Sequence, residues 1–188
     1  REVFEGDKFR VAVQFKSFIE DRIEYTITYN GVKHSNVLDV EPHRTYEIYG
    51  DFTASSGAAE VLIELRSLKL EYIERRRVEI LLMKPPRTEV VSAGIGGEAK
   101  IGKTTQLNLE LLNRSKSTAV ELVSRGSVYG HRVEERLRLD PGEETQIQLR
   151  IPILSIASLT ATKAELKIVE YPGGFVIKRD IELQEPEK

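Results

Sequence analysis

Residues 6–15 have the sequence GDKFRVAVQF, and 96 positions later residues 102–111 have the sequence GKTTQLNLEL. In both stretches a glycine precedes a run in which apolar and polar residues alternate. Alternation at a period of two is typical of a β-strand with one buried face. The apolar positions align in pairs: Val11 with Leu107, Val13 with Leu109, and Phe15 with Leu111. The two stretches therefore predict equivalent strands and an internal repeat.

Two further blocks repeat in the same order, at offsets that grow slowly along the chain. At an offset of 99, LDVEPHRTYEI aligns with LRLDPGEETQI, and at 103 the alternating residues from Val61 align with those from Ala164. At the same offset, VEI at Val78 aligns with IEL at Ile181. Three blocks in one order indicate two copies of one unit.

Other segments also alternate at a period of two, and they include residues 23–29, followed by the turn sequence Asn30-Gly31, and residues 145–151. Residues 58–82 contain good helix formers and admit a helix. Their apolar residues nonetheless alternate more cleanly than they follow a period of 3.6, and Leu68, Leu70 and Tyr72 continue that alternation. We therefore predict strands there as well.

These patterns predict an all-β fold of two tandem immunoglobulin-like (fibronectin-like) antiparallel β-sandwiches, residues 1–85 and 86–188, each with about seven short strands. We expect the first strand of the first domain to be shortened. Consecutive prolines break backbone pairing and stiffen a linker. Pro85 and Pro86 are accordingly the predicted hinge.

Residues 97–104, GEAKIGKT, match the phosphate-binding pattern G-x-x-x-x-G-K-[ST]. That loop binds phosphate only where a helix follows it and directs backbone amides at the anion. Here the sequence alternates after Lys103, and the aligned block at Gly6 has the strand pattern without the motif. We interpret the match as a glycine turn before a strand, and we expect no nucleotide to bind.

Composition excludes several classes of function. Among 188 residues, 28 Lys and Arg nearly balance 30 Asp and Glu, so the basic excess of a nucleic-acid-binding protein is missing. There is no Cys for a disulfide, thiolate nucleophile or Cys-based metal site, and no apolar run long enough to span a membrane. High charge, one Met and no Cys suit a protein from a thermophile.

We expect no catalytic, cofactor-binding or metal-binding residue. His34, Asp39 and His43 could be imagined as a surface metal site, but their spacing fits no ligand pattern, and solvated histidines are the simpler interpretation. Asn113, in the sequence Asn-Arg-Ser after a predicted strand, is a glycosylation acceptor if the protein is exported. The cluster Arg75-Arg76-Arg77 is a candidate interaction patch, although protection of a sheet edge explains it better.

KIGKTTQLNLELLNRSKSTA followed by LRLDPGEETQIQLRIP resembles bacterial and archaeal immunoglobulin-like modules of the cell-adhesion-related (CARDB-type) family. The resemblance covers residues 88–183, and the first copy shares it weakly. It implies a non-catalytic module with a protein partner, acting as spacer or binding unit in a larger surface or membrane-attached protein. Because the chain begins at Arg1, we expect it to be a piece of such a protein, outside the cytoplasm. The alternative is a carbohydrate-binding or substrate-positioning module of an enzyme.

Overall fold

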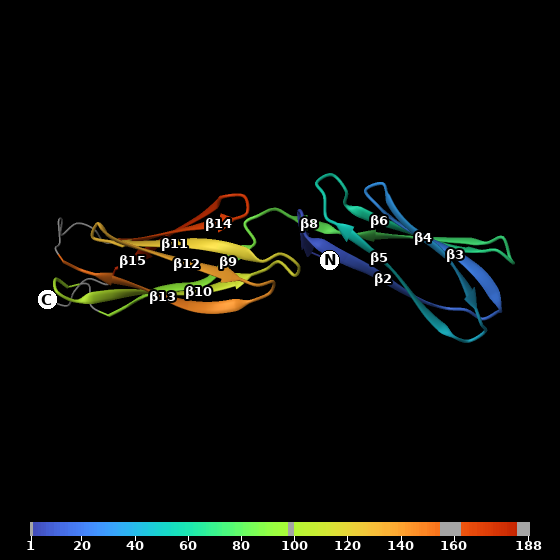
Figure 1. Ribbon diagram of the computed structural model, residues 1–188, viewed down its shortest axis with the longest axis horizontal. Coiled ribbons are helices and arrows are strands. Elements are labelled where there is room, and N and C mark those ends of the chain that lie inside the picture. Colours follow the sequence, from blue (N-terminus) through green and yellow to red (C-terminus); the bar gives the residue numbers. More distant parts are fainter. Residues whose placement is uncertain (1, 98–99, 155–162, 184–188) are drawn as a thin grey trace. The chain divides into compact units, whose positions relative to one another are not determined.

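The computed structural model describes residues 2–97, 100–154 and 163–183, and its regular elements are β-strands joined by turns (Figure 1). The predicted all-β fold is therefore confirmed. The chain divides into two compact units, Arg1–Lys84 (unit 1) and Pro85–Lys188 (unit 2). The boundary falls beside the consecutive prolines, where backbone pairing is interrupted.

Unit 1 places its strands in a two-stranded sheet β2–β5, a four-stranded sheet β4–β3–β6–β7 and a short parallel pair β1–β8. All pairs in the two larger sheets are antiparallel. The strands are β1 (Glu2–Phe4), β2 (Lys8–Lys16), β3 (Asp21–Tyr29), β4 (Val32–Val40), β5 (Thr45–Thr53), β6 (Glu60–Ser67), β7 (Ile73–Glu79) and β8 (Leu81–Met83).

Unit 2 has a three-stranded sheet β13–β10–β9 and a four-stranded sheet β12–β11–β14–β15, and every pair is antiparallel. Its strands are β9 (Thr88–Gly96), β10 (Thr104–Asn113), β11 (Val120–Val128), β12 (His131–Leu139), β13 (Glu144–Pro152), β14 (Lys163–Tyr171) and β15 (Phe175–Glu182). The four-stranded sheets of the two units have the same strand order.

The register between strands also repeats. Val13 lies opposite Ile48 in unit 1, and the residues aligned with them by the sequence, Leu109 and Ile147, lie opposite each other in unit 2. On the other sheet, Val61 pairs with Val78 just as Ala164 pairs with Ile181. The internal repeat predicted from sequence is thus a repeat of strand pairing.

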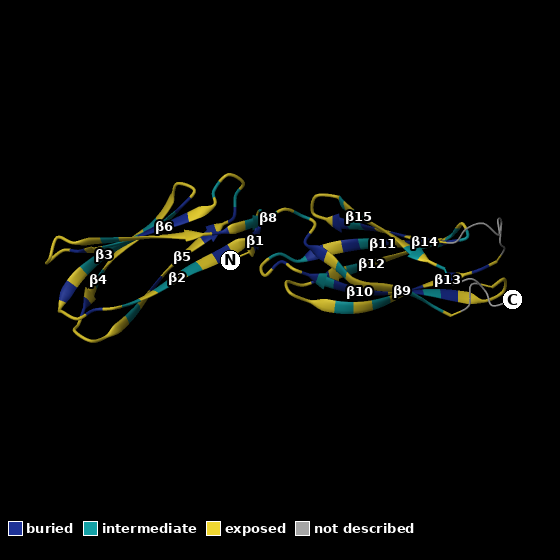
Figure 2. Ribbon diagram, turned by 180° about the vertical axis from the view of Figure 1, so that it is seen from behind, coloured by how far each residue is buried: buried dark blue, intermediate teal, exposed yellow. Residues whose placement is uncertain are grey.

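Each unit is a β-sandwich, because the inner faces of its two larger sheets enclose one apolar core. Along the strands, buried residues alternate with exposed ones, as Figure 2 shows by colour. The core of unit 1 includes Phe9, Ile27, Tyr29, Ile48, Phe52, Val61 and Ile63. The core of unit 2 includes Leu107, Leu109, Leu111, Leu122, Leu149, Ile151, Leu166 and Ile168.

The glycine of the apparent phosphate loop forms a turn, as predicted. Gly102 has a positive φ of 78°, its amide donates to the carbonyl of Ile153 at 2.8 Å, and β10 begins two residues later. Gly6 has a φ of 85° and donates in the same way to Ala54, also at 2.8 Å. In both units the glycine amide is therefore bonded to backbone, and a strand follows where phosphate binding would need a helix.

Gly126 occupies the position on β11 that Ile27 has on β3. A Cβ atom added at Gly126 would lie 2.7 Å from Cδ1 of Leu107 and 3.2 and 3.3 Å from Cδ1 of Leu149 and Ile151. These three side chains are at most 1% exposed. The leucines of unit 2 thus fill space that an isoleucine fills in unit 1, and a larger residue at Gly126 has no room.

We predict that Gly126→Ala lowers the free energy of unfolding of unit 2 by about 1–3 kcal/mol, because three packed side chains must move together. Urea denaturation followed by circular dichroism measures the change. Gly94→Ala is the control, since nothing lies within 4 Å of its added Cβ, and it should alter stability by less than about 0.5 kcal/mol. Equal effects of the two substitutions would contradict the packing argument.

Candidate functional site

Three loops of unit 1 meet at the end of the sandwich where β2 finishes. We call residues 17–20, 41–44 and 68–72, which connect β2 to β3, β4 to β5 and β6 to β7, the loop end. Backbone hydrogen bonds join the loops: Ser17 donates to Arg44 at 3.2 Å and His43 donates to Ser17 at 2.7 Å. Leu68 donates to Arg22 at 3.0 Å. The loops are therefore fixed to one another and to the strands.

A buried carboxylate, that of Asp21, holds two of these loops together. It accepts hydrogen bonds from the Ser67 hydroxyl and from the backbone amides of Arg22 at 2.7 Å and Lys69 at 3.0 Å. Burial acts to raise the pKa of Asp21, but the hydrogen bonds from Ser67, Arg22 and Lys69 together outweigh it, so the pKa lies below its ordinary value. The charged form of Asp21 is thus part of the folded loop end.

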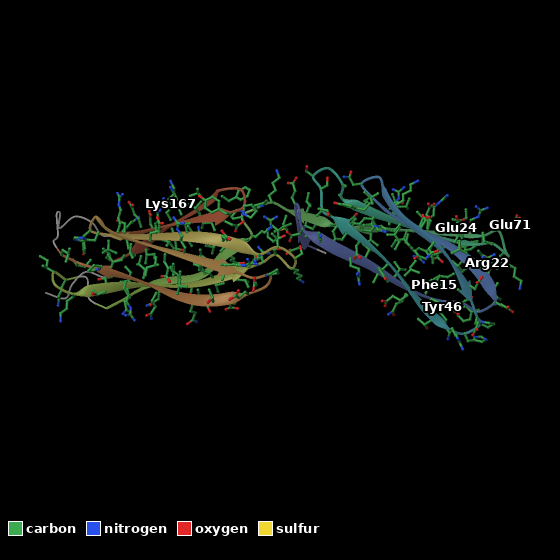
Figure 3. The ribbon with its side chains drawn as sticks, in the orientation of Figure 1. Phe15, Arg22, Glu24, Tyr46, Glu71 and Lys167 are labelled. Atoms are coloured by element: carbon green, nitrogen blue, oxygen red, sulfur yellow. The ribbon has the colours of Figure 1, made fainter. Side chains whose placement is uncertain are left out.

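Large apolar side chains are exposed on these fixed loops. Phe18 is 69% exposed, Leu70 63% and Tyr72 62%, and Ile19, Leu68 and Ile73 beside them are also exposed. Figure 3 labels Arg22 and Glu71 at this end of unit 1. Four of these residues, Leu68, Leu70, Tyr72 and Ile73, lie in one short segment, and several exposed apolar residues close together are a feature of protein-binding surfaces.

His43 and Lys16 contact the ring of Phe18. Its ring centroid lies 6.0 Å from that of His43 with an edge-to-face angle of 82°, and the Lys16 ammonium lies 5.7 Å from the ring centroid. Next to the loops is a hollow of about 720 Å³. It is lined by Glu20, Asp21, Arg22, Asp39, Val40, Glu41, Leu68 and Lys69. The loop end therefore combines protruding apolar groups with a charged recess.

The sequence pattern was misleading at Leu68, Leu70 and Tyr72, which were predicted to continue a strand. β6 ends at Ser67 and β7 begins at Ile73, so these residues form the connecting loop. The alternation of apolar residues in this loop does not correspond to a buried and an exposed face of a sheet. A signal for the exposed loop was the presence of three large apolar residues in a segment that is too short to form a strand of its own.

The corresponding end of unit 2 receives the start of β9. Glu170, which is fully buried, accepts hydrogen bonds from the backbone amides of Arg87 at 2.9 Å and Thr88 at 2.7 Å. The Arg87 carbonyl in turn accepts from the Arg114 amide at 2.9 Å. This end of unit 2 is occupied by its own chain, whereas the loop end of unit 1 exposes apolar groups.

Asn113, predicted as a glycan acceptor in a turn, is instead the fully buried last residue of β10. Its Nδ2 donates to the carbonyls of Thr118, Leu139 and Asp140 at 2.9, 3.3 and 3.1 Å, and its Oδ1 accepts from the Ser115 amide. The amide nitrogen that would carry a sugar is therefore enclosed and bonded. In the folded unit, Asn113 has a structural role, and the prediction of an accessible acceptor is corrected.

The arginine cluster lies on β7, an edge strand of the four-stranded sheet, as expected for edge protection. Each arginine forms an ion pair: Arg75 with Glu64 at 2.6 Å, Arg76 with Glu74 at 2.8 Å and Arg77 with Glu60 at 3.8 Å. The glutamates neutralise the cluster locally. This pairing argues against a patch that binds anions.

The predicted hinge residues Pro85 and Pro86 lie in the short connection between β8, which ends at Met83, and β9, which begins at Thr88. Because Arg87 and Thr88 are bonded to Glu170 through their amides, the side of the connection that belongs to unit 2 is fixed. Any hinge is therefore confined to residues 84–86.

The histidines do not assemble a metal site. His34 on β4 lies edge-to-face on Phe52 at 4.9 Å, with its Nε2 2.9 Å from the Asp51 carbonyl oxygen, whereas His43 contacts Phe18. Across the described residues, no group of three His, Cys, Asp or Glu could hold a metal ion. The same residues include no apolar helix of membrane-spanning length.

No protein-family model matches the chain, and no curated protein matches its sequence. Among solved structures it is similar to a β-glucuronidase from Bacteroides uniformis, with 9% identity and a TM-score of 0.40 over 93% of this chain, which spans 26% of the enzyme's length. A DUF4785 family protein from Legionella pneumophila has 12% identity and a TM-score of 0.33, covering 97% and 54% of the two chains. An anti-sigma factor domain-containing protein has 10% identity and a TM-score of 0.32, covering 88% and 79%.

We predict that Asn113→Ala destabilises unit 2 by about 2 kcal/mol, because three carbonyls lose their donor in a buried site. Thermal and urea denaturation measure the loss. Asn108→Ala on the exposed face of the same strand should change the free energy of unfolding by less than about 0.5 kcal/mol. If Asn113→Ala were as stable as the parent, the structural role would be refuted.

A second prediction concerns how the stability of unit 1 depends on pH. Because the pKa of Asp21 is lowered in the folded state, the unfolded chain binds the proton more readily, and stability should fall as pH drops through and below about 4. We expect Asp21→Asn to lower the melting temperature at pH 7, and the difference from the parent to shrink as pH falls to about 2.5. Asp39→Asn, which removes an exposed partner of Arg22, is the control and should have little effect at pH 7. A constant difference at all pH values would contradict the role of the charged carboxylate.

Proposed function

We propose that the chain is a non-catalytic interaction and spacer module, with two tandem immunoglobulin-like sandwiches. In this proposal it belongs to a larger surface or membrane-attached protein outside the cytoplasm, similar to the CARDB-type modules. Unit 1 binds a protein partner through the loop end, and unit 2 serves as the spacer.

The observation that carries the proposal is the exposure of Phe18, Leu70 and Tyr72 on loops that are fixed by hydrogen bonds. Apolar and aromatic groups supply most of the affinity at protein interfaces, and loops that are already ordered lose less entropy when they bind. The charged residues around the hollow would then provide specificity. Loops on a rigid sandwich are a common place for such sites.

The alternative is an accessory module that binds carbohydrate or positions the substrate of an enzyme. Phe18 and Tyr72 are the exposed aromatic side chains of the loop end that could stack on a sugar ring. A protein partner is favoured because aliphatic Leu68, Leu70 and Ile73 are exposed in the same segment as Tyr72, and aliphatic groups add little to the recognition of a hydroxyl-rich ligand. The two functions predict different binding partners and can be separated directly.

We predict that a photo-crosslinking amino acid in place of Tyr72, expressed in the source cells, captures one defined protein. After that protein is purified, Leu70→Glu in the otherwise unaltered chain should weaken its affinity roughly thirtyfold, the loss typical of an interface hot spot. Val37→Glu is the matched control, since Val37 is exposed on β4 outside the loop end. It should leave the affinity nearly unchanged.

Two results would contradict the protein-binding proposal. The first is equal weakening by Leu70→Glu and Val37→Glu, which would place the interface elsewhere. The second is specific binding on a glycan array that Tyr72→Ala abolishes, which would establish the carbohydrate alternative.

A further inference from the structure

Equivalent core positions on β2 and β10 differ in how far they are covered. On β10, Leu107, Leu109 and Leu111 are 0%, 2% and 0% exposed. On β2, the aligned residues Val11, Val13 and Phe15 are only half-buried, although they also face the core. The same inner row is thus fully covered in unit 2 and partly open in unit 1.

The difference lies in the neighbouring strand. In unit 2, β9 pairs with β10 from Thr88 opposite Asn113 to Gly96 opposite Gln106, and its Val90 and Ile95 pack against the core. In unit 1, β5 is the one described strand that pairs with β2, because the three-residue β1 pairs with β8. A strand position that is filled in unit 2 is therefore open beside β2.

The facing sheet has the same gap. Val78 on β7 is 41% exposed, whereas the aligned Ile181 on β15 packs against the core of unit 2. Both residues lie opposite core residues of the adjacent strand, Val61 and Ala164. Apolar groups on both sheets of unit 1 are left uncovered along the side where β9 lies in unit 2.

We propose that the outer edge of β2, here called the β2 edge, binds an extended segment of a protein partner. The segment adds as a strand antiparallel to β2, in the register that β9 has on β10, and places apolar side chains over Val11, Val13 and Phe15. Such addition supplies backbone hydrogen bonds along the edge and buries the open row. This site lies along β2 and meets the loop end at Lys16, whose ammonium also lies 5.7 Å from the Phe18 ring centroid. It does not depend on the function proposed for the loop end.

Charge identifies the kind of segment. The outward row of β2 carries Lys8, Arg10 and Lys16 and no acidic residue. Arg10 is already paired with Asp51 on β5 at 2.8 Å, so the charge of the partner is inferred from Lys16 at the end of the strand. In the register of β9 on β10, Glu89 lies opposite Leu112, the position that aligns with Lys16. An acidic residue at that place in the partner strand would therefore face Lys16. The segment is apolar on its inner side and carries an acidic residue opposite Lys16 on its outer side.

The same row disfavours a second copy of this chain. Antiparallel pairing of two β2 edges about Ala12 would place Lys8 of one copy opposite Lys16 of the other, at both ends of the pair. Like charges directly opposite one another destabilise a strand pair. A foreign acidic strand meets no such repulsion.

The test uses the complete chain and a synthetic peptide with the sequence of β9, TEVVSAGIG, as the probe. We expect saturable binding by NMR titration, with chemical-shift changes concentrated at the amides of β2 and slower hydrogen exchange at those that point away from β5. Val13→Glu in the chain should raise the peptide Kd at least about tenfold, whereas Ala12→Gln, a polar and uncharged change on the outward face of the strand, should not weaken binding.

A charge exchange provides the second variant, which does not disturb the core. Lys16→Glu in the chain should weaken binding of the β9 peptide. A peptide that carries Glu89→Lys should bind the Lys16→Glu variant with the affinity that the original peptide has for the unaltered chain. A peptide with Val90→Glu and Ile95→Glu should not bind. The proposal is overturned if the β2 amides do not respond to the peptide, if the charge exchange gives no rescue, or if sedimentation shows a dimer that Val13→Glu dissociates.

Discussion

The two units depend on the burial of one alternate row of apolar side chains between facing sheets. Neither sheet can remove its inner row from water alone, so each residue that faces inward needs a counterpart on the other sheet. In unit 2 this requirement is met along the whole of β10, where the inner leucines are almost completely buried. In unit 1 it is met near Phe9, whose ring lies 5.1 Å from Tyr29 and 5.8 Å from Phe52, and less well toward Phe15. The surfaces proposed for binding lie where this coverage is incomplete.

The ends of the sandwiches show how one backbone frame supports two different surfaces. Ser17 exchanges backbone hydrogen bonds with Arg44 and His43, and Asn113 exchanges the same bonds with Glu143 and Gly142. The side chains of Ser17 and Asn113, however, make different contacts. The amide of Asn113 closes this end of unit 2 by bonding three carbonyls, whereas the Ser17 hydroxyl bonds locally to Ile19 and leaves Phe18 exposed beside it. The frame is conserved within the chain, and the exposed chemistry is not.

The repeated strands and their equivalence could be predicted from the sequence, because alternation records which face of a strand is buried and a repeated alternation records a repeated sheet. The turn at Gly102 was predictable for the same reason, since Gly6 occupies the aligned position. The burial of Asn113 was not, because a polar residue after a strand is typical of a turn, and two of the three carbonyls that bond it, those of Leu139 and Asp140, come from a segment distant in sequence. The loop containing Leu70 was missed because the sequence does not show whether an apolar residue is buried or exposed, and Leu70 is exposed.

The edge strands differ in whether their charged residues face the core side of the sheet or the outside, and this difference affects which edges can pair with another strand. Arg76 on β7 and the aligned Arg179 on β15 lie opposite core residues of the neighbouring strand, so they share the inner face of the sheet. A charge on the inner side of an edge hinders any strand that would pair there, since the added strand would have to bury it. On β2 the inner row is entirely apolar, and the basic residues point outward. A strand added to β2 would therefore bury no charge on its inner side, whereas one added to β7 would have to cover Arg76.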